Sequence, residues 1–184
     1  MAKILTVCTG NICRSPVAAV MLSGYLGPEA LVGSAGTRAV VGAPIDPPML
    51  EALWGHADWV AGMGDNHRAV QLTPSLVEGA DLVVGMTRAH RDAAVVAFPL
   101  AMTYAVTLDE LAVIARLGLE LPGNDLDARL RNAGAVVARN RHLIAREGSI
   151  DIPDPYRESP AVYAQAAALI ADRVAVVASW LRGA

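Results

Sequence analysis

The stretch Cys8–Ser15 (CTGNICRS) combines a cysteine with an arginine six residues later and a serine directly after that arginine. A cysteine thiolate is a nucleophile, and a helix N-terminus or a nearby arginine stabilises it. The planar guanidinium of Arg14 fits two oxygens of a phosphate, and Gly10 lets the backbone approach a ligand because it has no Cβ atom. The stretch therefore predicts a nucleophile, Cys8, inside an oxyanion-binding loop. The expected phosphate-binding residues are Thr9, Gly10, Asn11, Ile12, Cys13, Arg14 and Ser15.

A second candidate lies far downstream, in the stretch Asp151–Pro160 (DIPDPYRESP). A thiolate that displaces an oxygen leaving group from phosphorus needs a proton donor for that oxygen. Asp154 stands between Pro153 and Pro155, which restrict the backbone and would hold a carboxylic acid in place. An Asp-Pro pair also occurs in ordinary turns. We interpret Asp154 as the general acid that complements Cys8.

The elements around these residues alternate between strands and helices. Apolar runs predict strands at Lys3–Val7, Leu31–Ser34, Ala80–Met86 and Thr103–Thr107. Helices are expected at Val17–Leu26, near Met49–His56, after Thr73-Pro74 and at Arg88–Ala97. Strands separated by helices pair in parallel, and ligands bind beyond the carboxyl ends of such strands. The cysteine loop occupies that place after the first strand.

The alternation predicts an α/β fold in which residues 1–184 form a single doubly wound domain. We expect a central four-stranded parallel sheet with helices on both faces and the phosphate-binding loop after the first strand. Residues 108–150 are expected to form an extended helical segment, which includes a helix at Asn124–Glu147. The arginines of that helix either form a solvated surface or dock an acidic partner. They are Arg129, Arg131, Arg139, Arg141 and Arg146. The helix at Val162–Leu181 is expected in the core.

The composition argues against several classes of protein. The chain has 184 residues and a net charge of −3, which does not suit a general nucleic-acid binder. Its longest apolar stretches are too short to span a bilayer, so we expect no membrane insertion, and its N-terminus lacks the features of a signal peptide. Two cysteines suit a reducing cytoplasm better than a disulfide-stapled secreted domain. No Cys/His cluster in the sequence suggests a metal site, and no cofactor is expected.

The loop motif and the acid motif Asp154-Pro155-Tyr156 together resemble those of the low-molecular-weight protein tyrosine phosphatases. Intermediate landmarks support the resemblance: SAGT at Ser34–Thr37, HRAVQLT at His67–Thr73, and ADLVVGM at Ala80–Met86. The resemblance implies hydrolysis of phosphotyrosine through a phosphocysteine formed on Cys8. Arg14 would bind the phosphoryl oxygens, and Asp154 would act first as acid and then as base. The implied partner is a tyrosine-phosphorylated protein or a small aryl phosphate, with phosphate or another oxyanion in the active site.

The same resemblance implies roles for further residues. Asn11, Ser34 and His67 match the hydrogen-bond network that holds the loop in shape, and Tyr156 would line the pocket wall. Cys13 recurs in the family as a redox partner that protects the nucleophile as a disulfide. The curl of the loop favours the same pairing, although Cys13 also fits a residue that only packs against the sheet.

Several positions depart from the family pattern. Val40 and Val41 stand where many members carry an aromatic residue at the pocket wall, and Arg157 replaces a second tyrosine after Tyr156. Val70 stands where the family has an arginine, and Val17-Ala18-Ala19 lacks a glutamate. These changes predict a weaker grip on the phenyl ring of small aryl phosphates than in most of the family, and Arg157 would attract acidic or multiply phosphorylated substrates.

Two other functions fit the same motifs. An arsenate reductase shares this type of fold and loop, but thioredoxin-linked versions need relay cysteines beyond Cys13, so an external thiol would be required. A phosphotyrosine-binding module without turnover would use the loop alone. The presence of Cys8, Arg14 and Asp154 together favours phosphatase chemistry.

Overall fold

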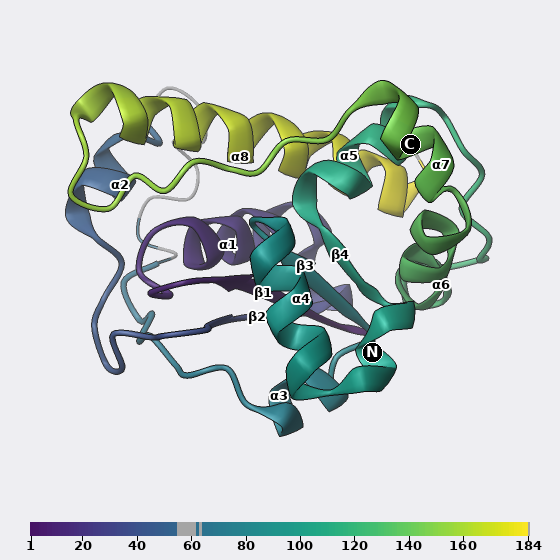
Figure 1. Ribbon diagram of the computed structural model, residues 1–184, viewed down its shortest axis with the longest axis horizontal. Helices are drawn as coiled ribbons and strands as arrows, with labels where there is room; N and C mark the ends of the chain where they lie inside the picture. Colours follow the sequence, from purple (N-terminus) through teal and green to yellow (C-terminus); the bar gives the residue numbers. More distant parts are fainter. Residues whose placement is uncertain (55–61, 63, 184) are drawn as a thin grey trace.

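The described strands form one parallel sheet in the order β2-β1-β3-β4 (Figure 1). The computed structural model describes residues 1–54, 62 and 64–183. The strands are β1 (Lys3–Cys8), β2 (Leu31–Gly36), β3 (Leu82–Gly85) and β4 (Ala105–Thr107). β1 pairs in parallel with both β2 and β3, and β3 pairs in parallel with β4. The predicted four-stranded parallel sheet is thereby confirmed, and all four strands direct their carboxyl ends to the same edge.

Helices cover both faces of this sheet (Figure 1). They are α1 (Arg14–Leu26), α2 (Pro47–Glu51), α3 (Pro74–Glu78), α4 (Arg88–Ala97), α5 (Leu108–Arg116), α6 (Leu126–Arg139), α7 (Arg141–Glu147) and α8 (Pro160–Arg182). Because side chains alternate along a strand, Ile4 packs in the cluster that contains α1, α5 and α8. Its neighbour Leu5 packs in the opposite cluster, with α3 and α4. The doubly wound arrangement is therefore also confirmed.

Several predicted elements differ in extent from the observed ones. The predicted strand at Thr103–Thr107 begins only at Ala105, because Pro99–Thr103 forms a short 3-10 helix, η3. The predicted helix at Asn124–Glu147 is divided into α6 and α7 at Asn140, whose side-chain Nδ2 donates to the Val136 carbonyl at 2.8 Å. Such local side-chain bonds compete with helix continuation. Helix α2 begins at Pro47, and His56, the predicted helix end, lies outside the described residues.

The arginines of α6 and α7 contact neighbouring parts of the fold. Arg129 donates to the main-chain carbonyls of Trp180 and Leu181, both at 2.7 Å, where α8 ends. Arg131 forms an ion pair with Asp127 on the same helix at 3.0 Å. Arginine side chains commonly satisfy the last carbonyls of a helix in this way. These contacts favour a structural role for Arg129 over a free docking surface.

Helix α8 is long and apolar enough, by length and composition alone, to cross a membrane. In this fold it packs against α1 and α5, and its buried residues include Ile170, Val174 and Leu181. The indole Nε1 of Trp180 donates to the Leu119 carbonyl at 2.7 Å. A core helix passes the same length and composition test, and the position of α8 fits that role.

Candidate active site

Cys8 is the last residue of β1, and the loop that leads into α1 begins there. Its side chain is buried, and Sγ accepts hydrogen bonds from the Asn11 backbone N–H at 3.3 Å and from the Ser15 hydroxyl at 3.0 Å. The N-terminus of α1 adds positive potential at the same place. Two donors and the helix N-terminus are therefore directed at the Cys8 sulfur.

The carbonyl groups of the loop are directed away from the pocket. Four of these carbonyls accept hydrogen bonds from backbone N–H groups outside the loop. The donor and acceptor residues are Thr37 and Cys8 (2.9 Å), Arg38 and Thr9 (2.9 Å), Val40 and Gly10 (3.0 Å), and Asp46 and Ile12 (2.8 Å). In a planar trans peptide the N–H points opposite to the C=O. The loop amides therefore face the side on which Cys8 Sγ lies, and together they form a cradle for an anion.

Asn11 holds the loop in this shape. Its φ of 56° lies in the left-handed region, which asparagine tolerates better than most residues. Its side-chain Nδ2 donates to the hydroxyls of Ser15 and Ser34 at 3.0 and 2.8 Å, and its Oδ1 accepts from the Val70 backbone N–H at 2.8 Å. His67 Nε2 lies 2.8 Å from the Asn11 carbonyl oxygen. The structure thus brings the expected supporting residues together, and position 70 takes part through its backbone.

Gly36 lets the loop pack against the end of β2. A Cβ atom at this position would lie 2.5 Å from the Thr9 carbonyl oxygen and 3.0 Å from the Asn11 backbone nitrogen. Such contacts would displace the loop itself. The glycine of the SAGT landmark therefore has a steric reason, which complements the hydrogen-bonding role of Ser34.

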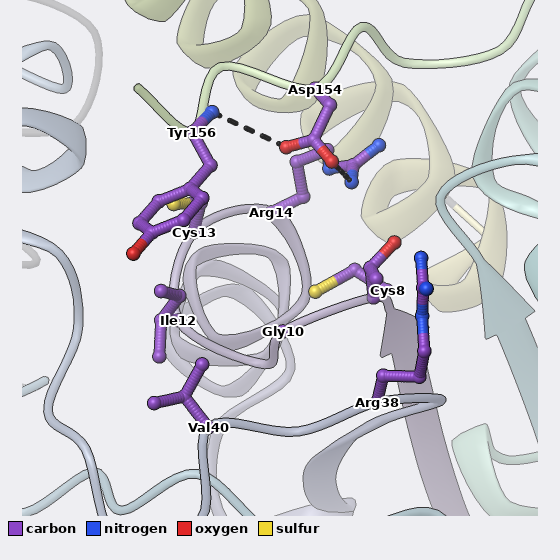
Figure 2. Close-up of a pocket in the computed structure, with 10 residues that line it drawn as sticks. Cys8, Gly10, Ile12, Cys13, Arg14, Arg38, Val40, Asp154 and Tyr156 are labelled. Carbon is purple, nitrogen blue, oxygen red and sulfur yellow. Dashed lines mark hydrogen bonds and ion pairs between the residues drawn. The ribbon is translucent and has the colours of Figure 1, made fainter. Parts of the chain in front are cut away.

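Arg14 lies buried at the first position of α1, with its guanidinium directed at the pocket (Figure 2). Nη1 donates to the Ile152 carbonyl at 3.1 Å, and Nη2 forms an ion pair with Asp154 Oδ2 at 2.6 Å. Its Nε is buried and has no hydrogen-bond partner in the described part of the chain. A buried donor of this kind, beside the loop amides, fits an oxyanion.

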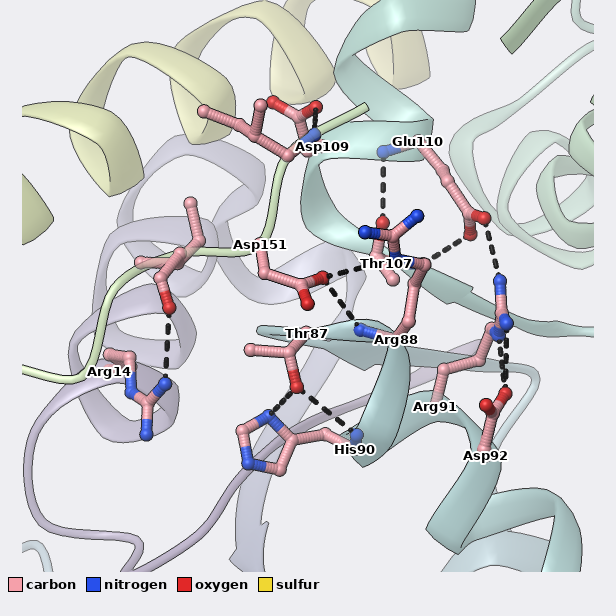
Figure 3. Close-up of polar contacts among 12 residues, drawn as sticks. Arg14, Thr87, Arg88, His90, Arg91, Asp92, Thr107, Asp109, Glu110 and Asp151 are labelled. Carbon is pink, nitrogen blue, oxygen red and sulfur yellow. Dashed lines mark hydrogen bonds and ion pairs between the residues drawn. The ribbon is translucent and has the colours of Figure 1, made fainter. Parts of the chain in front are cut away.

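The segment that carries Asp154 is fixed by hydrogen bonds to main-chain groups, and Figure 3 shows the contact of Asp151 with Arg88. The buried Ile152 donates its N–H to the Met86 carbonyl at 3.0 Å, just beyond β3. Asp151 accepts from the Arg88 backbone N–H at 2.8 Å, which attaches the segment to the start of α4. Asp154 itself is about half exposed, at 52% of its side-chain surface. The segment therefore presents a carboxyl group to both solvent and the pocket.

The pocket above Cys8 has a volume of about 310 Å³ (Figure 2). It is lined by Cys8, Thr9, Gly10, Ile12, Cys13, Arg14, Arg38, Val40, Asp154 and Tyr156. Val40 and Tyr156, which we expected at the wall, are among these residues. Val41 and Arg157, expected with them, are not: Val41 is 70% exposed, and the Arg157 guanidinium stacks 5.1 Å from the centre of the Tyr156 ring. Arg157 has a left-handed φ of 65°, so the chain turns there and carries the side chain off the lining.

Arg38 lines the pocket, although no motif in the sequence indicated it. Its backbone N–H binds the Thr9 carbonyl, and its exposed guanidinium stands beside Cys8 in Figure 2. Its position directly after SAGT is the signal that would have indicated it. His90 is a second residue that sequence reasoning missed; its ring is buried and contacts Thr9.

Cys13 belongs to a polar cluster with Asp46 and Tyr163, two residues that sequence reasoning also missed. Its thiol Sγ is 3.7 Å from Asp46 Oδ2, which also accepts a 2.6 Å hydrogen bond from the Tyr163 hydroxyl. Burial, together with the charge of Asp46, raises the pKa of the Cys13 thiol. Burial and the bond to Asp46 also raise the pKa of Tyr163 to about 12. Cys13 is therefore a protonated thiol that donates to a carboxylate.

A family model described as low molecular weight phosphotyrosine protein phosphatase matches residues 3–110. The chain belongs to this family, which confirms the resemblance inferred from the motifs. Two of its sequence relatives carry the names of different phosphatases. The probable low molecular weight protein-tyrosine-phosphatase EpsP of Ralstonia nicotianae is 46% identical over 88 residues, 48% of this chain and 57% of that protein. The protein-arginine-phosphatase of Geobacillus stearothermophilus is 37% identical over 111 residues, 59% of this chain and 70% of that protein.

Solved structures match a larger part of the chain. Wzb of Vibrio vulnificus in complex with benzylphosphonate has a TM-score of 0.67 and 27% identity, over 97% of both chains. The YwlE arginine phosphatase of Geobacillus stearothermophilus has a TM-score of 0.70 and 26% identity, over 97% of this chain and 92% of that one. Tyrosine and arginine phosphatases are thus both among the similar proteins, while EpsP is matched over little more than half of its length.

Proposed function

We propose that this chain is a protein tyrosine phosphatase that hydrolyses aryl phosphate monoesters through a phosphocysteine on Cys8. The observation that carries the proposal is the shape of the loop. Its carbonyls are bound from outside, so its amides face the Cys8 sulfur. The buried Arg14 contributes an Nε donor that has no partner among the described residues. The three equatorial oxygens of a phosphoryl group in transfer need hydrogen-bond donors that point at them from several sides. A turn that only connects a strand to a helix does not need such donors.

In the first step the Cys8 thiolate attacks phosphorus in line with the departing oxygen. A sulfur–phosphorus bond forms, and the bond from phosphorus to the aryl oxygen breaks. Asp154 donates its proton to that oxygen, so the product leaves as a phenol. Arg14 and the loop amides bind the three equatorial oxygens, where negative charge is spread in the transition state.

In the second step water hydrolyses the phosphocysteine. Asp154, now a carboxylate, accepts a proton from the water as its oxygen attacks phosphorus, and the sulfur leaves as a thiolate. The Ser15 hydroxyl and the Asn11 N–H already contact Sγ, so both donors stabilise that leaving group. Inorganic phosphate is then released and the site returns to its starting protonation state.

The pocket wall favours an aryl phosphate over phosphoarginine. Ile12, Val40 and Tyr156 present apolar or aromatic surface above the nucleophile, and a phenyl ring gains from contact with such surface. A guanidinium placed against Ile12 and Val40 would lose hydration there, and neither side chain offers an acceptor for its N–H groups. The expected substrates are therefore tyrosine-phosphorylated proteins or small aryl phosphates, with phosphate as a product that binds the same loop.

We extend the proposal to the organisation and location of the chain. The nucleophile comes from residue 8 and the acid from residue 154, and both line one pocket, which supports a single phosphatase domain over residues 1–184. Both cysteines are free thiols, which fits the cytoplasm. Binding of nucleic acid and insertion into a membrane are not part of the proposal.

The test is hydrolysis of phosphotyrosine peptides and of aryl phosphates with leaving groups of different pKa. Cys8→Ser should abolish turnover and still bind phosphate or vanadate. Asp154→Asn should slow poor leaving groups most, because these depend most on protonation. Equal slowing across all leaving groups would contradict the role of Asp154. Phosphoarginine should be the poorer substrate, and the reverse order would overturn the substrate assignment.

The same preparation separates the two other functions. A binding module would hold phosphotyrosine without releasing phosphate, whether or not Cys8 is intact. An arsenate reductase would consume an external thiol in proportion to added arsenate. Phosphate release that depends on Cys8, without arsenate-dependent thiol consumption, supports the phosphatase and excludes both.

A further inference from the structure

His90 is a buried histidine that the proposed mechanism does not use. It lies in the first turn of α4 with 6% of its surface exposed, and Figure 3 shows its ring beside Thr87. Nδ1 is 2.9 Å from the Thr87 hydroxyl, and Nε2 is 2.9 Å from the Thr9 hydroxyl. One ring therefore connects the start of α4 to the residue that follows Cys8.

The hydrogen bonds of Thr87 favour one of the two tautomers of the His90 ring. Thr87 caps α4, and its oxygen accepts the backbone N–H of His90 at 3.3 Å. Its own hydrogen is then available for Nδ1, which makes Nδ1 the acceptor. A neutral imidazole has one acceptor and one donor, so Nε2 carries the hydrogen and donates it to the Thr9 oxygen. The opposite tautomer would direct two donors at Thr87 and leave its hydroxyl hydrogen without this acceptor.

The surroundings keep the ring neutral. Burial and, after it, the Arg14 guanidinium lower the pKa of His90 to about 4, against the opposing charges of Asp154 and Asp151. Near pH 7 the ring therefore remains a one-donor, one-acceptor group. A protonated ring would instead donate from both nitrogens and could not accept from Thr87.

The Thr9 hydroxyl accepts from His90 and retains one hydrogen to donate. Thr9 lines the pocket together with Cys8 and Arg14. We propose that His90 is a positioning residue, which orients the Thr9 hydroxyl so that it donates to an oxygen of the phosphoryl group. This inference rests on the proposed function, and it adds a side-chain donor to the loop amides and the Arg14 guanidinium.

Two substitutions of His90 separate this role from a purely structural one. The amide of Gln reaches the position of Nε2 and keeps a donor for Thr9, whereas the amide of Asn reaches the position of Nδ1 and keeps only the bond to Thr87. His90→Asn should lower kcat/KM for an aryl phosphate by about 10- to 100-fold, the range for one hydrogen bond to a charged group. His90→Gln should stay much closer to wild type. If His90 only supports α4, the order is reversed, and that result would overturn the proposal.

Substitutions of Thr9 complete the test. Thr9→Val should cause the same loss as His90→Asn, and Thr9→Ser should restore most of the activity. In a Thr9→Val background, His90→Asn and His90→Gln should be equivalent, because the effect of His90 passes through the hydroxyl. Independent, additive losses would contradict this. Thermal unfolding of every variant identifies losses of activity that come from misfolding. If the His90 variants misfold, Thr9→Val and Thr9→Ser decide the question on their own.

Two readouts do not depend on turnover. Ring ¹⁵N chemical shifts should identify Nε2 as the protonated nitrogen at pH 7, and the opposite tautomer would overturn the argument. Vanadate should bind more weakly to His90→Asn and Thr9→Val than to wild type, whereas unchanged binding would contradict a donor to the oxyanion. If the chain hydrolyses no phosphoester, the proposed function fails, while these two measurements still decide whether His90 orients Thr9 toward a bound oxyanion.

Discussion

Arg14 Nη2 and Asp154 Oδ2 lie 2.6 Å apart, so the proposed acid contacts the guanidinium that we propose binds the phosphoryl group. A carboxylate and a phosphoryl dianion would compete for the same cation. When Asp154 becomes protonated it loses most of its attraction to Arg14, and it can turn toward the leaving oxygen. We therefore expect the ion pair to couple arrival of the substrate to release of the acid.

The first prediction follows from this competition. Asp154→Asn should bind inorganic phosphate severalfold more tightly than wild type, because one negative charge beside the oxyanion is removed. Its kcat should fall by about 10²- to 10⁴-fold, the usual contribution of a general acid. Competitive inhibition by phosphate provides the measurement. Glu158→Gln is the matched control, since it removes an exposed charge from the same segment and should change neither quantity. Weaker phosphate binding by Asp154→Asn would show that the ion pair does not oppose the ligand.

A second prediction concerns Arg38. Its exposed guanidinium at the pocket edge should attract acidic residues that flank a phosphotyrosine. Arg38→Gln should raise KM for an acid-flanked phosphopeptide by about two- to fivefold more than for a neutral one, the scale of an exposed charge pair. Added salt should remove the difference. Arg146→Gln on α7, which removes an arginine paired with Glu147, is the charge-matched control. Equal effects on both peptides would leave Arg38 without a part in substrate choice.

A third prediction concerns Cys13 as redox partner of Cys8. Burial and the Asp46 carboxylate raise the pKa of the Cys13 thiol, so little thiolate is available to attack an oxidised Cys8. Asp46→Asn removes the charge but not the burial, and it should therefore lower this pKa and speed disulfide formation after peroxide. The rate should also increase with pH, because the thiolate fraction grows.

Recovery of activity by dithiothreitol measures this protection. We expect Asp46→Asn to recover more completely than wild type after a fixed exposure to peroxide, and Cys13→Ser to recover least. Tyr163→Phe is a useful comparison, because it removes a hydrogen bond to Asp46 while the carboxylate stays in place. If Cys13→Ser recovers as well as wild type, Cys13 has no protective role and only packs in the loop.

The fourth prediction separates two contributions of Asn11. Asn11→Ala and Asn11→Gly both lose the side-chain bonds to Ser15, Ser34 and Val70. Only glycine adopts the left-handed φ of 56° without steric cost. Asn11→Ala should therefore lower the free energy of unfolding by about 1 kcal/mol more than Asn11→Gly. Urea unfolding measures the difference, and equal losses would mean that the backbone relaxes away from this conformation in both variants.

The sequence was most informative where chemistry and local structure coincide. Cys8, Gly10, Arg14 and Pro16 predict a strand, a loop and a helix from residue types alone, and the observed β1 and α1 have that arrangement. Asp154 was identified through its prolines and its motif. The prediction of the cysteine loop and that of the Asp154 segment both rest on residues adjacent in sequence, which a sequence motif can describe.

Ser34 and His67, whose contacts with Asn11 are distant in sequence, were named only through the family resemblance, and other residues with distant contacts were not identified. The helix start at Thr87 could have been recognised, but the contact of His90 with Thr9 exists only because β1 and β3 are adjacent in the sheet. Asp46 reaches Cys13 through a loop whose course no local pattern defines. The side chain of Asn140 bonds to the backbone where α6 ends, and the apolar periodicity of the sequence does not predict such a bond.

The contacts that shape the cysteine loop have a consequence for how the chain reaches its active form. Asn11 binds Ser34 and His67, which are 23 and 56 residues away, and Arg14 binds Ile152, which is 138 residues away. Contacts between residues so distant in sequence form late in folding, because chain entropy must first be lost. Cys8 and Arg14 are synthesised well before Ile152, yet the position of the Arg14 side chain depends on that residue. During refolding, recovery of helical signal should therefore precede recovery of turnover.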